Sequence, residues 1–200
     1  MINAHEIGRL VAEAVLNDQG PCFYPGKFKP PHKGHFEAAK ALASKPYVKQ
    51  LIIVISSKVI EGITPEDSLA VWNIYLDALK IPNAIVQIST DESPIVTIRH
   101  YLDNNPGVDP VYVAVGDDEK DDEQYGQSLQ QDYGDRVKVI KVQERAGEID
   151  APHVRELLRA GDLEGFMEAV PEAAFNRGAG PKIFKMLAPK ITNADAPDEA

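Results

Sequence analysis

One segment of the chain, residues 24–35, concentrates basic side chains. It reads YPGKFKPPHKGH and holds five nitrogen bases within nine residues: Lys27, Lys29, His32, Lys33 and His35. Ammonium and imidazole N–H groups are suited to stabilising charge on phosphate oxygens. Gly26 and Gly34 would let the backbone approach a ligand closely. Because a helix is expected to start at the end of the segment, its free N–H groups would also point at an anion.

The segment fits neither of two common nucleotide-binding patterns, since GxxxxGK[ST] and GxGxxG are both absent. Two histidines three residues apart at a helix start also have plainer interpretations, as solvated cap residues or as metal ligands. A zinc site would need further His, Cys or carboxylate ligands at suitable spacing, and none stands nearby. The pattern therefore favours a phosphate-handling site built on His32 and His35.

Strand and helix patterns alternate around this segment. A short apolar stretch, 22–24, precedes it, and a helix is expected after it over 34–44. Residues 50–56, QLIIVIS, are typical of a strand buried on both faces. Thr64 to Asp67 (TPED) combine an N-cap, an early proline and an acid three residues after the cap, which predicts a helix to about Leu79. Further strands are expected at 84–89, 111–115 and 137–142, and further helices at 95–103, 123–131, 151–160, 163–170 and 181–187.

This alternation predicts βαβ units and a doubly wound, Rossmann-like α/β fold with a five-stranded parallel sheet and additional terminal helices. We expect one domain over residues 1–190, with an N-terminal helical extension in 1–20 whose apolar face falls on 7–16. Residues 191–200 are expected to form a flexible acidic tail, frayed from Thr192. In such sheets ligands bind beyond the carboxyl ends of the strands, where the loop after the first strand lies.

Composition excludes several classes of protein. Lys plus Arg number 21 against 31 Asp plus Glu, a net charge of −10, which argues against a general nucleic-acid or anionic-membrane binder. The single cysteine, Cys22, excludes an internal disulfide framework. The longest apolar run, Leu51 to Ile55, is too short to span a bilayer, and the first nine residues lack the features of a signal peptide. We therefore expect a cytoplasmic protein with neither nucleic-acid nor membrane partners.

Residues 26–35, GKFKPPHKGH, resemble the signature of the HxGH nucleotidyltransferase superfamily, which has the form GxFxPxHxGH. Every fixed position is matched, namely Gly26, Phe28, Pro30, His32, Gly34 and His35. The superfamily includes nicotinamide-mononucleotide and pantetheine-phosphate adenylyltransferases and several cytidylyltransferases. The similarity extends through the predicted strands to about residue 160.

The resemblance implies an NTP whose α-phosphate lies beside His32 and His35, which we expect to be catalytic together with Lys27. An acceptor phosphate attacks in line, pyrophosphate leaves, and Mg²⁺ bridges the phosphates as cofactor, with no protein metal ligand assigned. Around the histidines, four further residues are expected to contact the nucleotide: Gly26, Phe28, Lys29 and Gly34.

A second superfamily motif, ISSTxxR, has a partial counterpart in residues 149–155, IDAPHVR. Ile149 and Arg155 match, whereas Asp150 and Pro152 replace hydroxyl residues. We expect Asp150 to cap the following helix. Arg155 is expected to bind the nucleotide through its leaving pyrophosphate; the alternative is an exposed arginine paired with an acid such as Glu156 or Asp162.

Five further residues carry expectations of their own. Gly116 and Asp117 resemble the superfamily's G-x-D loop beside the nucleoside, although Asp117 could instead cap a helix. Lys58, after the second strand, is expected either to bind the acceptor or to be a surface lysine. Arg99 has the same two alternatives. Trp72 is expected in the core, on the apolar face of its helix.

These observations together predict a magnesium-dependent nucleotidyltransferase, with ATP favoured over CTP and a phosphorylated small molecule as acceptor. The motif with its basic Lys27 resembles GRFQPFHxGH of nicotinamide-mononucleotide adenylyltransferases, which favours a pyridine mononucleotide acceptor; YPGKF equally resembles YPGTF of pantetheine-phosphate adenylyltransferases. A cytidylyltransferase acting on a phospho-alcohol remains an alternative. So does a non-catalytic nucleotide-binding or structural protein on the same fold. Because superfamily members are often oligomers, a homo-oligomer is also expected.

Overall fold

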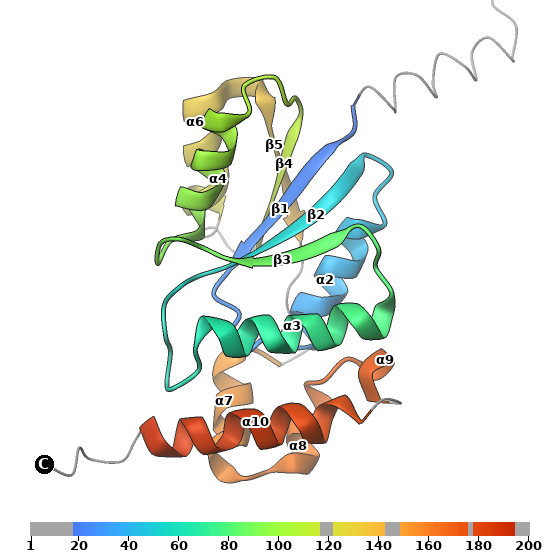
Figure 1. Ribbon diagram of the computed structural model, residues 1–200, viewed down its shortest axis with the longest axis vertical. Helices are drawn as coiled ribbons and strands as arrows, with labels where there is room; N and C mark the ends of the chain where they lie inside the picture. Colours follow the sequence, from blue (N-terminus) through green and yellow to red (C-terminus); the bar gives the residue numbers. More distant parts are fainter. Residues whose placement is uncertain (1–17, 117–121, 143–148, 176–177, 195–200) are drawn as a thin grey trace, which may run out of the picture.

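The computed structural model describes residues 18–116, 122–142, 149–175 and 178–194 of the chain. Within these ranges, five parallel strands form one sheet in the order β3-β2-β1-β4-β5 (Figure 1). Their bounds are β1 Gly20–Gly26, β2 Val48–Ile55, β3 Ala84–Ile88, β4 Val111–Gly116 and β5 Val137–Val142. The predicted five-stranded, Rossmann-like α/β fold is confirmed. The helix predicted over 7–16, Asp117 and the tail from residue 195 lie outside the described residues.

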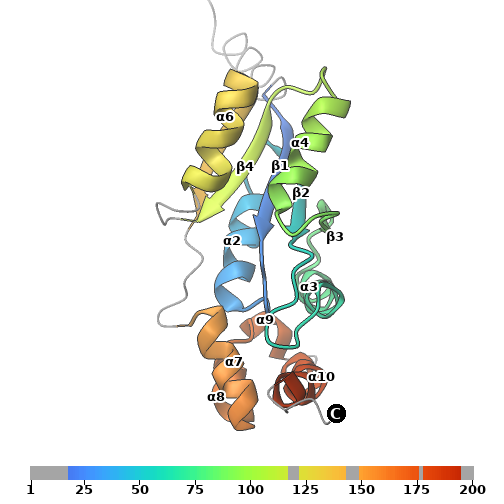
Figure 2. The ribbon, with the colours of Figure 1, turned by 90° about the vertical axis from the view of Figure 1, so that its left-hand side faces the viewer.

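Helices cover both faces of the sheet (Figure 2). On one face lie α2 (Lys33–Ala43) and α3 (Pro65–Leu79), and on the other α4 (Pro94–Asn104) and α6 (Ser128–Tyr133). A π-helical turn, η1 (Asp122–Gln127), precedes α6, and a 3-10 turn, η2 (Gly134–Arg136), leads into β5.

Each face of the sheet has its own apolar core. Along β2, Leu51, Ile53 and Ile55 belong to the cluster that contains the buried residues of α2 and α3. Ile52 and Val54 belong to the cluster with α4 and α6. This alternation follows from the period of two in a strand, and it explains why a strand buried on both faces is apolar at consecutive positions.

In the described C-terminal residues, four helices pack beside one another at the end of the molecule toward which β1 runs (Figure 1). They are α7 (Ala151–Ala160), α8 (Leu163–Glu168), α9 (Glu172–Phe175) and α10 (Ala179–Ala194). In the described ranges, none of the helices combines the length and apolar character needed to cross a membrane.

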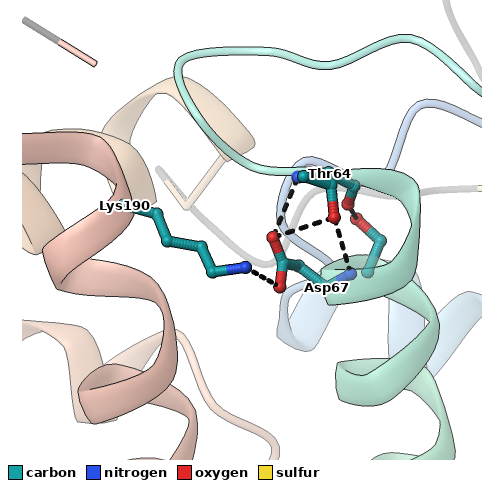
Figure 3. A network of polar contacts seen from close by, with 4 residues as sticks. Thr64, Asp67 and Lys190 are labelled. Atoms are coloured by element: carbon teal, nitrogen blue, oxygen red, sulfur yellow. Dashed lines mark hydrogen bonds and ion pairs between the residues drawn. The ribbon is translucent and has the colours of Figure 1, made fainter. Parts of the chain in front are cut away.

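An ion pair joins α10 to the start of α3 (Figure 3). Lys190 Nζ lies 2.6 Å from Asp67 Oδ1, while Asp67 Oδ2 accepts from the backbone N–H of Thr64, the N-cap, at 3.0 Å. Burial alone would raise the pKa of Asp67, but the hydrogen bonds from Lys190 and Thr64 outweigh it and lower the pKa. The predicted capping sequence at Thr64 is therefore confirmed. Its acid, Asp67, also connects the start of α3 to α10 through the ion pair with Lys190.

Two predicted elements before the C-terminal helices differ substantially from the structure. The first strand extends well beyond 22–24, because β1 is central in the sheet and hydrogen-bonds to β2 along its whole length. The helix predicted over 123–131 is divided between η1 and α6.

The C-terminal helices also differ from the prediction. The helix predicted over 163–170 ends at Glu168, and the one predicted over 181–187 runs from Ala179 to Ala194, so residues 192–194 are helical and not part of a tail. This helix continues through Pro189. Ile183, Leu187 and Ile191 recur every helical turn and are at most 1% exposed, and their burial outweighs the cost of an internal proline.

Candidate active site

The loop between β1 and α2, residues 27–32, lies where the strand order reverses. β1 and β4 are neighbours in the sheet, but the crossover that follows β1 leads through α2 to β2, whereas the one that follows β4 leads through α6, on the opposite face, to β5. This is the point at which doubly wound sheets leave a crevice for ligands. The sequence-based placement of residues 24–35 at this edge is therefore confirmed by the topology.

His32 and His35 form a compact pair at the start of α2. His32 is the N-cap: its Nδ1 accepts from the Gly34 N–H at 3.1 Å, and its own backbone N–H donates to His35 Nδ1 at 3.3 Å. The two rings have centroids 3.7 Å apart, and they are 3% and 9% exposed. Because each Nδ1 accepts a hydrogen bond, each neutral ring carries its proton on Nε2.

Burial keeps both imidazoles neutral. It lowers the pKa of His32 from 6.5 to about 4, although the nearby Asp150 carboxylate acts in the opposite direction. The pKa of His35 is lowered well below 6.5, first by burial and then by the proximity of His32. At neutral pH the site therefore presents two uncharged N–H donors.

The backbone N–H groups at the start of α2 are not free, contrary to the sequence-based expectation. Lys33 N–H donates to the carbonyl of Ala169, the C-cap of α8, at 2.8 Å, and Gly34 N–H donates to His32. The expectation was wrong because it treated the helix start as open, whereas a histidine capping box and a segment more than 130 positions later occupy these donors. Gly34 itself is buried.

Three backbone carbonyls, at the end of β1 and in the loop, accept hydrogen bonds from three distant parts of the chain. The Gly26 carbonyl accepts from Ser56 N–H at the end of β2 (2.9 Å), and the Phe28 carbonyl accepts from Ser68 Oγ of α3 (2.6 Å). The Lys29 carbonyl accepts from Arg155 Nη1 of α7 (2.8 Å). Ser68 was not among the residues singled out from the sequence, because its contact with Phe28 spans 40 positions. These bonds fix the backbone that leads to the histidines.

Phe28 and Gly26 act together in packing this loop. The Phe28 ring is 3% exposed and makes edge contacts with Tyr24, Trp72 and His35. A Cβ on Gly26 would lie 2.5 Å from that ring, so the glycine provides space for Phe28. Phe28 also has φ = 51°, in the left-handed region that is costly for a bulky residue. The aromatic contacts and the Ser68 hydrogen bond offset that cost.

The two loop lysines are placed differently. Lys29 is 1% exposed, and its Nζ donates to the carbonyls of Lys27 and Ser56 at 3.1 and 3.2 Å. Burial lowers the pKa of Lys29 to about 8, against the opposing effect of Glu66 and Asp67. Lys27 is exposed. Of the two, only Lys27 has its side chain at the surface.

Arg155 lies one helical turn into α7 and does not pair with Glu156 or Asp162, the acids named from the sequence. Its Nε is 2.8 Å from Oε1 of Glu61, in the loop between β2 and α3. Glu61 also pairs with Arg159, whose Nη2 lies 2.5 Å from Oε2. Glu61 and Arg159 were missed because nothing local in the sequence relates positions almost one hundred residues apart.

Asp150 caps α7 as predicted, since its Oδ1 accepts from the His153 N–H at 2.8 Å. It therefore provides a carboxylate, not a hydroxyl, at the start of this helix.

The remaining predicted residues are spread around the sheet. Lys58 is exposed just after β2, and its N–H donates to Ser56 Oγ at 3.2 Å. Gly116 is the buried last residue of β4. Arg99 is on the other face of the sheet, where it pairs with Asp132 and donates to Ser128 Oγ of α6 at 2.8 Å. Its guanidinium is thus already engaged in joining α4 to α6.

The polar groups described around the histidines do not fit a Mg²⁺ ion held by the protein. Magnesium prefers oxygen ligands in octahedral geometry, whereas imidazole, ammonium and guanidinium groups dominate this loop. Among the described residues, no three His, Cys, Asp or Glu side chains lie close enough together to bind a metal. Asp150, the acid that affects His32, is engaged in capping α7.

Comparison with solved structures identifies the fold of the chain. No family model matches the chain, and no curated protein matches it by sequence. Two solved structures of Plasmodium falciparum nicotinic acid mononucleotide adenylyltransferase, complexed with APC and with NaAD, are similar to it in structure. Each has a TM-score of 0.57 and covers 84% of this chain and 98% of its own, at 11% and 10% identity respectively. The chain shares the fold of these adenylyltransferases.

Proposed function

We propose that this protein is a nucleotidyltransferase that transfers AMP from ATP to a phosphorylated small molecule, and that a pyridine mononucleotide is the acceptor. The observation that carries the proposal is the buried, neutral pair His32 and His35 at the switch point of the sheet. The similarity in fold to a nicotinic acid mononucleotide adenylyltransferase supports the choice of nucleotide and acceptor.

The chemistry follows from the tautomer that the capping hydrogen bonds impose. With both Nδ1 atoms accepting, the Nε2–H groups donate to non-bridging oxygens of the α-phosphate, whose charge grows as the reaction proceeds. An oxygen of the acceptor's phosphate forms a bond to the α-phosphorus, and the bond from this phosphorus to the bridging oxygen of the β-phosphate breaks. Pyrophosphate leaves with that electron pair, so the protein forms no covalent bond.

Cationic side chains then bind the charged ends of the substrates. Arg155, fixed to the Lys29 carbonyl, lies on the helix proposed to contact the leaving pyrophosphate. Lys27 and Lys58 are exposed at the carboxyl edge and are proposed to attract the triphosphate and the acceptor phosphate. Lys29 has a different proposed role: its ammonium holds the loop by binding two backbone carbonyls. Because the described residues do not fit a protein-held Mg²⁺, we propose that the ion enters with the triphosphate as part of the substrate.

Pyrophosphate release tests this function. The full chain is incubated with Mg²⁺, ATP or CTP, and nicotinate mononucleotide, nicotinamide mononucleotide, phosphopantetheine or glycerol 3-phosphate. We expect release with ATP and a pyridine mononucleotide, and its loss in His35→Ala. His100→Ala, a change at an exposed histidine of α4, is the matched control and should keep full activity.

Two other outcomes would contradict parts of the proposal. Release with CTP alone would show a cytidylyltransferase. Nucleotide binding by calorimetry without release for any acceptor would show a non-catalytic nucleotide-binding protein. The carboxylate that Asp150 places at the start of α7, where superfamily enzymes have a hydroxyl, is the observation that favours this second candidate.

A further inference from the structure

The side chain of Glu61 lies between two guanidinium groups of α7. Its Oε1 is 2.8 Å from Arg155 Nε, and its Oε2 is 2.5 Å from Arg159 Nη2. Arg155 and Arg159 are four residues apart, so they lie on the same face of the helix, one turn from each other. Two cations thus converge on one carboxylate, which leaves the group of three with a net positive charge.

This group of three is connected to the loop that carries the histidines. Arg155 Nη1 donates to the carbonyl of Lys29, which is three positions before His32, and the Arg155 side chain is 13% exposed. A chain of phosphates that has one end at the histidines could therefore continue toward α7. Arg155 would be the first cation along it and Arg159, 38% exposed and one turn further, the second.

The Glu61 carboxylate makes the same kind of contact with these arginines as an anionic ligand would make. A carboxylate and a phosphate both offer paired oxygens to a guanidinium, and both form charge-assisted hydrogen bonds. The hydrogen bonds from Arg159 and Arg155 outweigh the effect of burial and lower the pKa of Glu61, so the carboxylate is ionised at neutral pH. Its backbone has φ = 47°, an unfavourable value for glutamate, so contacts elsewhere must offset the cost of this conformation.

We propose that Arg159 joins Arg155 in binding the polyphosphate of the nucleotide, and that Glu61 is an internal competitor for these two arginines. The inference rests on the proposed function, since it deepens the same site. The competitor sets the affinity for polyphosphate: pyrophosphate and the triphosphate bind by displacing the carboxylate, and Glu61 returns when pyrophosphate leaves.

Calorimetric titration of the full chain with sodium pyrophosphate and with ATP tests the proposal. We expect Glu61→Gln to bind pyrophosphate about tenfold more tightly, because the amide keeps the shape but loses the charge that competes. Arg159→Met should bind about tenfold more weakly, and Arg159→Lys should recover part of the loss. Glu156→Gln, which removes the same charge from an exposed side chain of α7, is the matched control and should match the wild type.

A gain in affinity cannot come from damage to the fold, so Glu61→Gln decides the matter. If its affinity for pyrophosphate equals or falls below that of the wild type, while the wild type transfers AMP, this inference is wrong and the proposed function stands. If Arg159→Met binds like the wild type, Arg159 is not a ligand. If neither the wild type nor Glu61→Gln binds pyrophosphate or ATP, both the inference and the proposed function are wrong.

Discussion

Replacing His32 with Asn removes a buried titrating group from the start of α2 and keeps a side chain able to accept from the Gly34 N–H. Asparagine is among the preferred N-cap residues, so the cap itself should survive. In the wild type, His32 binds a proton in the unfolded chain below about pH 6.5, but in the folded protein only below about pH 4. Acid therefore favours the unfolded state, and the stability contributed by the neutral ring is lost as the pH falls from about 6.5 to about 4.

The size of the effect follows from the same values. The pKa difference of about 2.5 corresponds to roughly 3 kcal/mol when both states are protonated, and to about 2 kcal/mol at pH 5. Urea unfolding at pH values from 7.5 to 5, followed by the fluorescence of the buried Trp72, gives the free energies. Between pH 7.5 and pH 5, we expect the free energy of unfolding to fall by about 2 kcal/mol more for the wild type than for His32→Asn.

The control is His100→Gln, which removes an exposed histidine of α4 and should follow the wild-type profile. A constant difference in the free energy of unfolding between the wild type and His32→Asn from pH 7.5 to 5 would refute the reasoning. The His32 ring would then have the same pKa in the folded and unfolded states. The two buried, neutral donors assumed in the proposed mechanism would be lost with it.

Three further changes test the packing around the site. Gly26→Ala places a Cβ 2.5 Å from the Phe28 ring and should cost about 1–3 kcal/mol in urea unfolding; wild-type stability would show that the ring can move freely. Lys190→Met breaks the ion pair with Asp67, and since Lys190 is 41% exposed the loss should be no more than about 1 kcal/mol and should shrink in high salt. Folding lowers the pKa of Lys29 to about 8, so the wild type should gain stability relative to Lys29→Met as the pH rises from 8 to 10. A constant difference in stability between the two proteins would mean that the ammonium is not desolvated.

Local patterns were sufficient for much of the fold. The strand predicted at 137–142 and the helix predicted at 151–160 have the same bounds in the structure, and Asp150 caps that helix as expected. The burial of Trp72, which is 0% exposed, is also confirmed. These features depend on residues within one or two turns of each other, or on an apolar pattern with a fixed period.

The contacts that shape the site are long-range, and for that reason the sequence did not reveal them. A lysine in a polar loop suggests exposure, yet Lys29 is buried because the carbonyl of Ser56 lies beside it in space. An arginine on a helix suggests a partner one turn away, yet Arg155 pairs with Glu61. The start of α2 looked open, yet Ala169 accepts from one of its N–H groups. Each of these partners comes from a different element, so only the tertiary fold brings them to the histidine loop.

Nitrogen NMR of the histidine rings, with and without ATP, tests the central claim most directly. In protein labelled with ¹⁵N-histidine, and assigned with His32→Asn, the account predicts that His32 and His35 are neutral Nε2–H tautomers at pH 7. On addition of Mg²⁺ and ATP their Nε2 resonances should shift, while those of the exposed His100 stay in place. Rings of the opposite tautomer, or resonances of His32 and His35 that do not respond to saturating ATP, would contradict the account.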